Sequence, residues 1–71
     1  MNDIVLPGLY RHFKGNLYRV IGDIMDTETD TYKVLYQNEQ GSYYVRSYES
    51  WLDIAYDTYG NPVERFRRVG N

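Results

Sequence analysis

A chain of 71 residues without a cysteine is too short for two independent cores and has neither disulfides nor thiolate metal ligands, which excludes a disulfide-rich secreted scaffold. Its formal net charge of −2 gives no overall attraction to nucleic acid or to anionic membranes, and no stretch reaches the about 20 apolar residues that span a bilayer. We therefore predict one cytoplasmic, non-membrane domain over residues 1–71, with a core built largely from the aromatic side chains that form 17% of the chain.

The beginning of the chain predicts a hairpin. Alternation of apolar and polar residues after Pro7-Gly8 predicts a short strand that ends near Phe13, and Gly15-Asn16 is typical of a tight turn. A second strand is predicted over residues 17–25. Because side chains alternate between the two faces of a strand, one set is expected to face the core: Tyr18, Val20, Gly22 and Ile24.

Two further strands follow a polar, acidic loop at residues 26–30, whose composition favours turns. They are predicted over residues 31–36 and 42–46, and the turn between them lies at residues 38–41. Tyrosine and β-branched residues, which favour a pleated surface, are frequent in both. The first two thirds of the chain are thus predicted to form a four-stranded meander.

A short helix is predicted near residues 48–55, because Ser47 can cap it and apolar side chains recur at helical spacing. A turn at residues 57–62 then leads to a last strand over 63–69, in which Phe66 is expected to point inward. We predict a mainly β fold: a five-stranded, strongly bent sheet or small barrel of the Src-homology-3 type with one short helix.

Several motifs together resemble one bacterial family, domain of unknown function 1653. The most specific is the opening run from Pro7 to Val20, which contains Gly-x-Tyr-Arg-His-aromatic-Lys-Gly, and the others follow along the chain: Thr27-Glu28-Thr29, Val34-Leu35-Tyr36, Tyr44-Val45-Arg46 and Arg65-Phe66. The likeness extends from Pro7 to Val69. The chain departs from the family pattern at Ser47, where a proline is expected, and at Asp26-Thr27, in place of His-Ser. The resemblance implies a small β-rich domain without an assigned catalytic residue or ligand.

The first candidate site is an aromatic and basic edge. Tyr10, Arg11 and His12 form a run in which a ring, a cation and an imidazole can hold an anion by charge-assisted hydrogen bonds and stacking. The expected edge also includes three residues of later strands: Tyr36, Tyr44 and Arg46. We predict that it binds a protein segment or a small anionic ligand. The alternative is structural, with the rings in the core and the cations in surface ion pairs.

The second candidate site is the basic patch near the end of the chain, formed by Arg65, Arg67 and Arg68. Alternation places Arg68 on the opposite face from the other two, so the three are not expected to act as one surface. Contacts with two or three phosphates would give only weak nucleic-acid binding. Pairing with nearby acidic side chains is the structural alternative.

No catalytic residue, cofactor or metal site is predicted. The chain has no cysteine nucleophile, a single histidine, His12, and no glycine-rich phosphate loop before a helix. The acidic loop at residues 26–30 lacks the length and the glycine of a calcium-binding loop. We predict a non-enzymatic interaction module, which is a monomer or a homodimer, since exposed sheet edges favour pairing.

Overall fold

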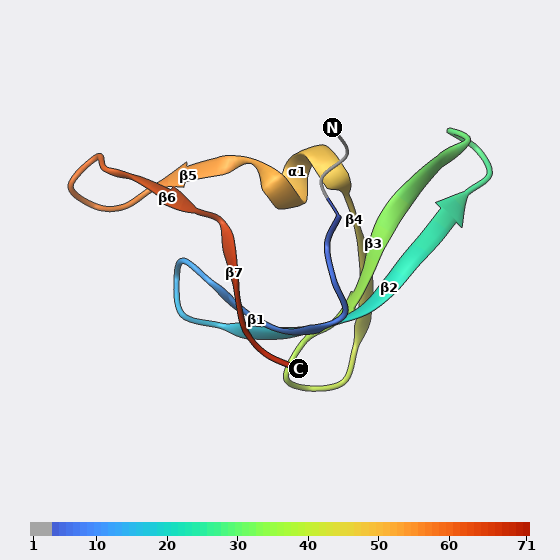
Figure 1. The fold of residues 1–71 in the computed structure, drawn as a ribbon, viewed down its shortest axis with the longest axis horizontal. Helices are drawn as coiled ribbons and strands as arrows, with labels where there is room; N and C mark the ends of the chain where they lie inside the picture. Colours follow the sequence, from blue (N-terminus) through green and yellow to red (C-terminus); the bar gives the residue numbers. More distant parts are fainter. Residues whose placement is uncertain (1–3) are drawn as a thin grey trace.

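The computed structural model describes residues 4–71; the first three residues of the predicted domain lie outside it. The described residues form seven strands and one short helix (Figure 1), with these bounds: β1 Gly8–His12, β2 Leu17–Asp26, β3 Thr31–Gln37, β4 Tyr43–Ser47, α1 Tyr48–Leu52, β5 Ile54–Tyr56, β6 Pro62–Glu64 and β7 Phe66–Gly70. No helix in this part of the chain is long and apolar enough to cross a membrane.

Five of the strands form one antiparallel sheet in the order β4-β3-β2-β1-β7. The first four follow one another as a meander, and the last strand returns to pair with β1. Because β4 and β7 end the order without pairing with each other, the sheet is open. The prediction of a mainly β fold is confirmed. Of the two predicted forms, the structure has the bent open sheet and not the closed barrel.

A bulge in β2 corrects the predicted core face of this strand. Val20 is opposite Tyr36, but the next pairing in the ladder joins Gly22 to Leu35, so one extra residue lies in β2. An extra residue reverses the alternation beyond it and bends the strand. Asp23 pairs with Val34 and therefore lies on the inner face of the sheet. The simple alternation had placed Gly22 and Ile24 on that face instead.

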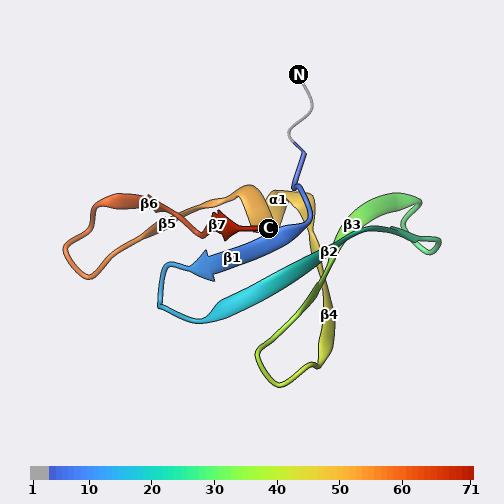
Figure 2. The same cartoon turned by 60° about the horizontal axis from the view of Figure 1, so that its bottom comes forward.

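The region after β4 differs from the prediction in two ways. The helix begins as expected, with the Ser47 hydroxyl accepting a hydrogen bond from Ser50 N, but it ends at Leu52 rather than at residue 55. Residues 54–56 instead form β5, which pairs with β6 as a separate hairpin. The expected strand over 63–69 is accordingly divided between β6 and β7. Figure 2 shows this hairpin projecting from the side of the sheet.

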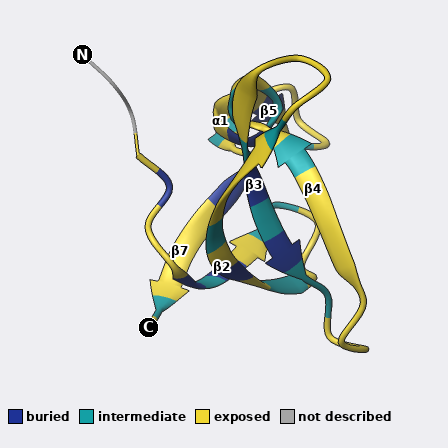
Figure 3. Cartoon of the chain, turned by 90° about the vertical axis from the view of Figure 1, so that its right-hand side faces the viewer, coloured by how far each residue is buried: buried dark blue, intermediate teal, exposed yellow. Residues whose placement is uncertain are grey.

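The core lies between α1 and the concave inner face of the bent sheet (Figures 1 and 3). Trp51 of the helix and Phe66 of β7 are both buried, as predicted for Phe66. The remaining buried members come from four other segments: Val5, Tyr10, Val20, Val34 and Tyr36. Four of the seven buried residues of this cluster are aromatic, as expected for a chain rich in tyrosine.

Candidate functional site

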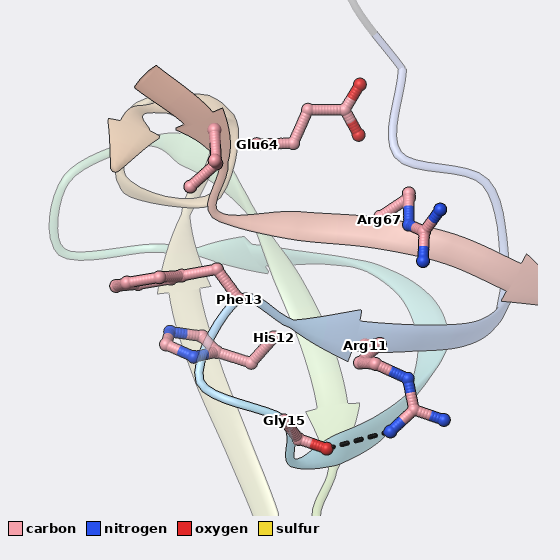
Figure 4. Close-up of a pocket in the computed structure, with 7 residues that line it drawn as sticks. Arg11, His12, Phe13, Gly15, Glu64 and Arg67 are labelled. Carbon is pink, nitrogen blue, oxygen red and sulfur yellow. Dashed lines mark hydrogen bonds between the residues drawn. The ribbon is translucent and has the colours of Figure 1, made fainter. Parts of the chain in front are cut away.

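A hollow of about 410 Å³ lies at the side of the sheet, where the β1–β2 turn approaches β6 and the start of β7. Its lining combines cationic, aromatic and apolar side chains, drawn in Figure 4: Arg11, His12, Phe13, Gly15, Val63, Glu64 and Arg67. We call it the arginine hollow. Its volume falls within the range of about 300–1,000 Å³ that is usual for small-ligand pockets.

Arg11 and Arg67 lie directly opposite each other on β1 and β7. Residues that are opposite in an antiparallel pair have their side chains on the same face, so the two arginine side chains extend from neighbouring positions on the outer face (Figure 4). The Nη1 of Arg11 donates to the carbonyl of Gly15 at 2.9 Å, and this bond fixes the side chain against the β1–β2 turn. Both arginine residues are exposed.

Neither of these arginines has a carboxylate partner in the described part of the chain. The ion pairs found over residues 4–71 join Lys33 to Asp26 at 2.6 Å and Arg65 to Asp53 at 3.8 Å. Glu64 is the one acidic residue that lines the arginine hollow, and it is not within ion-pairing distance of either arginine. The hollow thus contains two cations on neighbouring positions, neither of which forms an ion pair.

His12 and Phe13 form the aromatic side of the hollow. Their ring centroids lie 4.6 Å apart, and Figure 4 shows the two rings one above the other, on the side away from the guanidinium groups. The Nζ of Lys14 lies 5.7 Å from the centroid of the Phe13 ring, which adds a third cation nearby. The arrangement places a flat apolar surface across the hollow from the two arginine side chains.

The imidazole of His12 is held in a defined state. Its Nδ1 accepts a hydrogen bond from the backbone N of Lys14 at 3.1 Å, so the neutral ring carries its proton on Nε2. Burial lowers the pKa of His12, and the positive charges of Arg46, Arg65 and Lys14 lower it further. Since the ordinary value is already below 7, His12 is neutral at pH 7 and offers a hydrogen-bond donor rather than a charge.

The predicted aromatic and basic edge is divided between two faces of the sheet. Tyr10 is a core residue: it is buried, its hydroxyl donates to the carbonyl of Leu6 at 2.8 Å, and its ring meets Trp51 edge-on. Burial raises the pKa of Tyr10. Arg11 points to the outer face, as its position one residue along the strand requires. The structure therefore separates Tyr10 from Arg11, and only Arg11 and His12 of the run line the hollow.

The other three predicted residues of this edge gather on the inner face. Tyr36 is buried, and its ring lies 5.8 Å from that of Tyr44. Arg46 packs over the ring of Phe66 at 5.2 Å and donates to the Ser50 hydroxyl at 2.9 Å. These contacts make Tyr36 and Arg46 part of the packing between the sheet and α1, whereas Tyr44 remains exposed at the sheet margin.

The three arginines of the second candidate patch are also dispersed. Arg65 is half-buried beside Asp53, and Arg67 lies opposite Arg11 on the outer face. Arg68 shares the face of Tyr10 and donates through Nη2 to the carbonyl of Pro7 at 2.9 Å. No single surface holds all three, as the alternation predicted. Binding of nucleic acid through this patch stays a prediction.

The hollow also includes residues that the sequence did not assign to any site. Phe13, Val63 and Glu64 line it together with Arg67, which belonged to the other predicted patch. The sequence contained one usable signal, the adjacency of Phe13 to the Arg11-His12 pair. The contribution of β6 could not be expected, because the β5–β6 hairpin was itself not predicted. Among residues 4–71, no three acidic or histidine side chains are placed to hold a metal ion.

The chain is thus a small, open antiparallel β domain with the cationic and aromatic arginine hollow at one side. Residues 8–68 match the family model for a protein of unknown function, DUF1653, and the chain belongs to this family. The structure is similar to the crystal structure of a DUF1653 protein from Bordetella bronchiseptica, with 31% sequence identity and a TM-score of 0.83. That similarity covers 93% of this chain and 88% of the other. No curated protein matches the chain.

Proposed function

We propose that this protein is a non-enzymatic binding module that holds an anionic group between Arg11 and Arg67. The observation that carries the proposal is that these two arginines are directly opposite across β1 and β7, without an ion-pair partner in the described part of the chain. The ligand class is a small molecule or a chain end that carries a phosphate or carboxylate group. A cytoplasmic location remains a prediction from the sequence.

The energetics of the arginine pair favour this function. Like charges directly opposite in a sheet are destabilising by a few tenths to about 1 kcal/mol. A bound anion turns the same pair into two sets of charge-assisted hydrogen bonds, because each guanidinium offers a planar fork of donors that fits a carboxylate or a phosphate. The arrangement is therefore unfavourable in the free protein and favourable in an anion complex.

The aromatic side of the hollow suggests what the rest of the ligand is like. Phe13 presents a ring across the hollow from the two cations, and neutral His12 adds a polarisable ring with one N–H donor. Val63 contributes an apolar surface from β6. A ligand with an anionic end and a flat or apolar body would make contacts with all three kinds of side chain.

Two features support a binding rather than a catalytic role. The residues that line the hollow include no hydroxyl or thiol side chain that could act as a nucleophile. The Nδ1 of His12 is already engaged by a backbone N–H, so its lone pair is not free to accept a proton from a ligand. Glu64 is the one carboxylate of the lining, and its charge opposes the binding of an anion.

The test is an NMR titration of the ¹⁵N-labelled protein with pyrophosphate in one series and with an acetylated tetraglutamate peptide in another. We expect amide shifts centred on Arg11, Gly15 and Arg67, and the series that saturates first identifies phosphate or carboxylate as the preferred group. The Arg67→Gln variant should lose about tenfold or more in affinity, as expected for a lost charge-assisted hydrogen bond.

Two variants act as controls. Arg19→Gln removes the same charge from an exposed arginine on the outer face of β2, outside the hollow, and should leave binding almost unchanged. Glu64→Gln should tighten binding, since it removes the opposing charge. Equal losses in Arg67→Gln and Arg19→Gln would mean diffuse attraction and no site, and shifts that avoid the hollow in both series would refute the proposal.

A further inference from the structure

The two walls of the arginine hollow differ in chemistry and are held apart by the backbone. Phe13 N donates to the carbonyl of Arg65 at 2.9 Å, so the β1–β2 turn is tied to the junction of β6 and β7. Arg11 and Phe13 line the hollow two residues apart, about 6.6 Å along an extended backbone, and Figure 4 shows their side chains diverging. A single phosphate or carboxylate group held by the arginines therefore leaves the aromatic wall uncovered.

The aromatic wall is suited to a flat ring. The ring of His12 lies 4.6 Å from that of Phe13, and this contact supports the Phe13 ring. Val63 of β6 adds an apolar surface to the same hollow. Stacking of a nucleobase on an aromatic side chain raises affinity by roughly five- to 150-fold and depends little on which base it is. A ligand that carries a base in addition to its anionic group would contact a wall that a bare anion does not reach.

Glu64 indicates that the ligand also has hydrogen-bond donors, because a carboxylate in the lining otherwise only repels an anion. Its side chain is exposed and forms no ion pair in the described part of the chain. In the view of Figure 4 it lies between the ring of Phe13 and the guanidinium of Arg67. An acidic side chain that accepts from a ribose hydroxyl is a recurrent feature of nucleotide sites. The order ring, carboxylate and cation matches the order base, sugar and phosphate.

We propose, on the basis of the anion-binding function proposed above, that the ligand is a nucleoside 5′-monophosphate. Arg11 and Arg67 hold its phosphate, Phe13 stacks on its base, and Glu64 accepts from a ribose hydroxyl. The volume of about 410 Å³ is near the lower end of the range for small-ligand pockets, which suits one nucleotide better than a dinucleotide. An aryl phosphate has the ring and the anion but no donor, so it would leave Glu64 opposing the ligand.

The test compares four probes by NMR titration of the ¹⁵N-labelled protein: AMP, 2′-deoxy-AMP, ribose 5-phosphate and pyrophosphate. AMP should bind at least about fivefold more tightly than ribose 5-phosphate, since only AMP carries the base. It should also bind roughly three- to tenfold more tightly than 2′-deoxy-AMP, as expected for one net hydrogen bond. The shifts caused by AMP should include the amides of Phe13 and Val63 as well as those of Arg11 and Arg67.

Three variants assign the contacts. Phe13→Leu keeps an apolar side chain but removes the ring, so it should reduce the affinity for AMP to that for ribose 5-phosphate and leave pyrophosphate binding unchanged. Tyr59→Leu removes a ring that is 88% exposed and lies outside the hollow, and it is the matched control. Glu64→Ala should abolish the preference for AMP over 2′-deoxy-AMP, while pyrophosphate binds more tightly because the opposing charge is gone.

The possible results distinguish the nucleotide from the anion site itself. Pyrophosphate binding at Arg11 and Arg67, with AMP no tighter than ribose 5-phosphate, would overturn the nucleotide assignment and leave the anion site intact. Equal losses of AMP affinity in Phe13→Leu and Tyr59→Leu would also overturn it, because the base would then stack on any exposed ring. Equal affinity for AMP and 2′-deoxy-AMP would overturn the contact assigned to Glu64. No binding of any of the four probes would refute the proposed function as well.

Discussion

The indole of Trp51 lies flat on the ring of Phe66, with the centroids 3.8 Å apart and the planes 5° apart. Tyr10 and Tyr36 meet the indole edge-on at 5.4 and 5.1 Å. Through these contacts the short helix α1 is joined to strands β1, β3 and β7 at once. The stack therefore holds together the two ends of the chain and positions β7, which carries Arg67.

Loss of this stack should remove most of the stability of the domain. Truncating a buried aromatic residue to alanine typically costs about 3–5 kcal/mol, and small domains often have little more than about 5 kcal/mol in total. We expect Trp51→Ala to be largely unfolded in urea titrations followed by circular dichroism. Tyr59→Ala, at a residue that is 88% exposed, should change the unfolding free energy by less than about 0.5 kcal/mol. Similar effects of the two substitutions would contradict the assigned core.

Gly8 should be the glycine least tolerant of a side chain. Its φ is +144°, and a Cβ built on it would lie 2.6 Å from the carbonyl O of Gly70, a backbone atom of the paired strand β7. Gly41 also has a positive φ, +84°, but has open space around it. Urea unfolding should show a loss of about 2 kcal/mol or more for Gly8→Ala and about 1 kcal/mol for Gly41→Ala. Equal losses would mean that the contact of β1 with β7 is looser than described.

The single histidine should make stability depend on pH in a narrow window. Burial, and then the charges of Arg46, Arg65 and Lys14, lower the pKa of His12 in the folded chain, so the unfolded chain binds this proton at higher pH. The unfolding free energy should have its full value above about pH 6.5. It should decrease as the pH falls from there through the pKa of His12 in the folded chain. Urea titrations across this pH window should show that the unfolding free energy of the His12→Gln variant no longer depends on pH in this way. A slope that persists unchanged in the variant would assign the titration to another group.

The parts of the fold that could be predicted are those set by local chemistry. The Gly15-Asn16 turn, the alternation of β1, β3 and β4 and the Ser47 cap each depend on residues close in sequence. The bulge in β2 could have been suspected from Gly22, since a glycine within a strand often marks one, but alternation alone gives no register. The helix was overextended because Ala55 fits helical spacing as well as it fits the buried position of β5.

The candidate site was harder to predict, because it depends on pairing between distant segments. Arg11 and Arg67 were assigned to different patches, and only the register of β1 with β7 places them opposite each other. The β6 side of the hollow needed the β5–β6 hairpin, whose turn is organised by the Asp57 carboxylate accepting from Tyr59 N and Asn61 N at 2.9 Å. Residue type alone could identify the arginines, but not their geometry.

The most direct test of the central claim is the melting temperature of the Arg67→Gln variant, measured with and without pyrophosphate. Removing one of two opposed cations should raise the melting temperature of the free protein by a few degrees, because the repulsion of up to about 1 kcal/mol is relieved. The same variant should lose the stabilisation by pyrophosphate that the unmodified chain shows, while Arg19→Gln keeps it. A variant that melts lower, or that responds to pyrophosphate as the unmodified chain does, would contradict an anion-binding role for this pair.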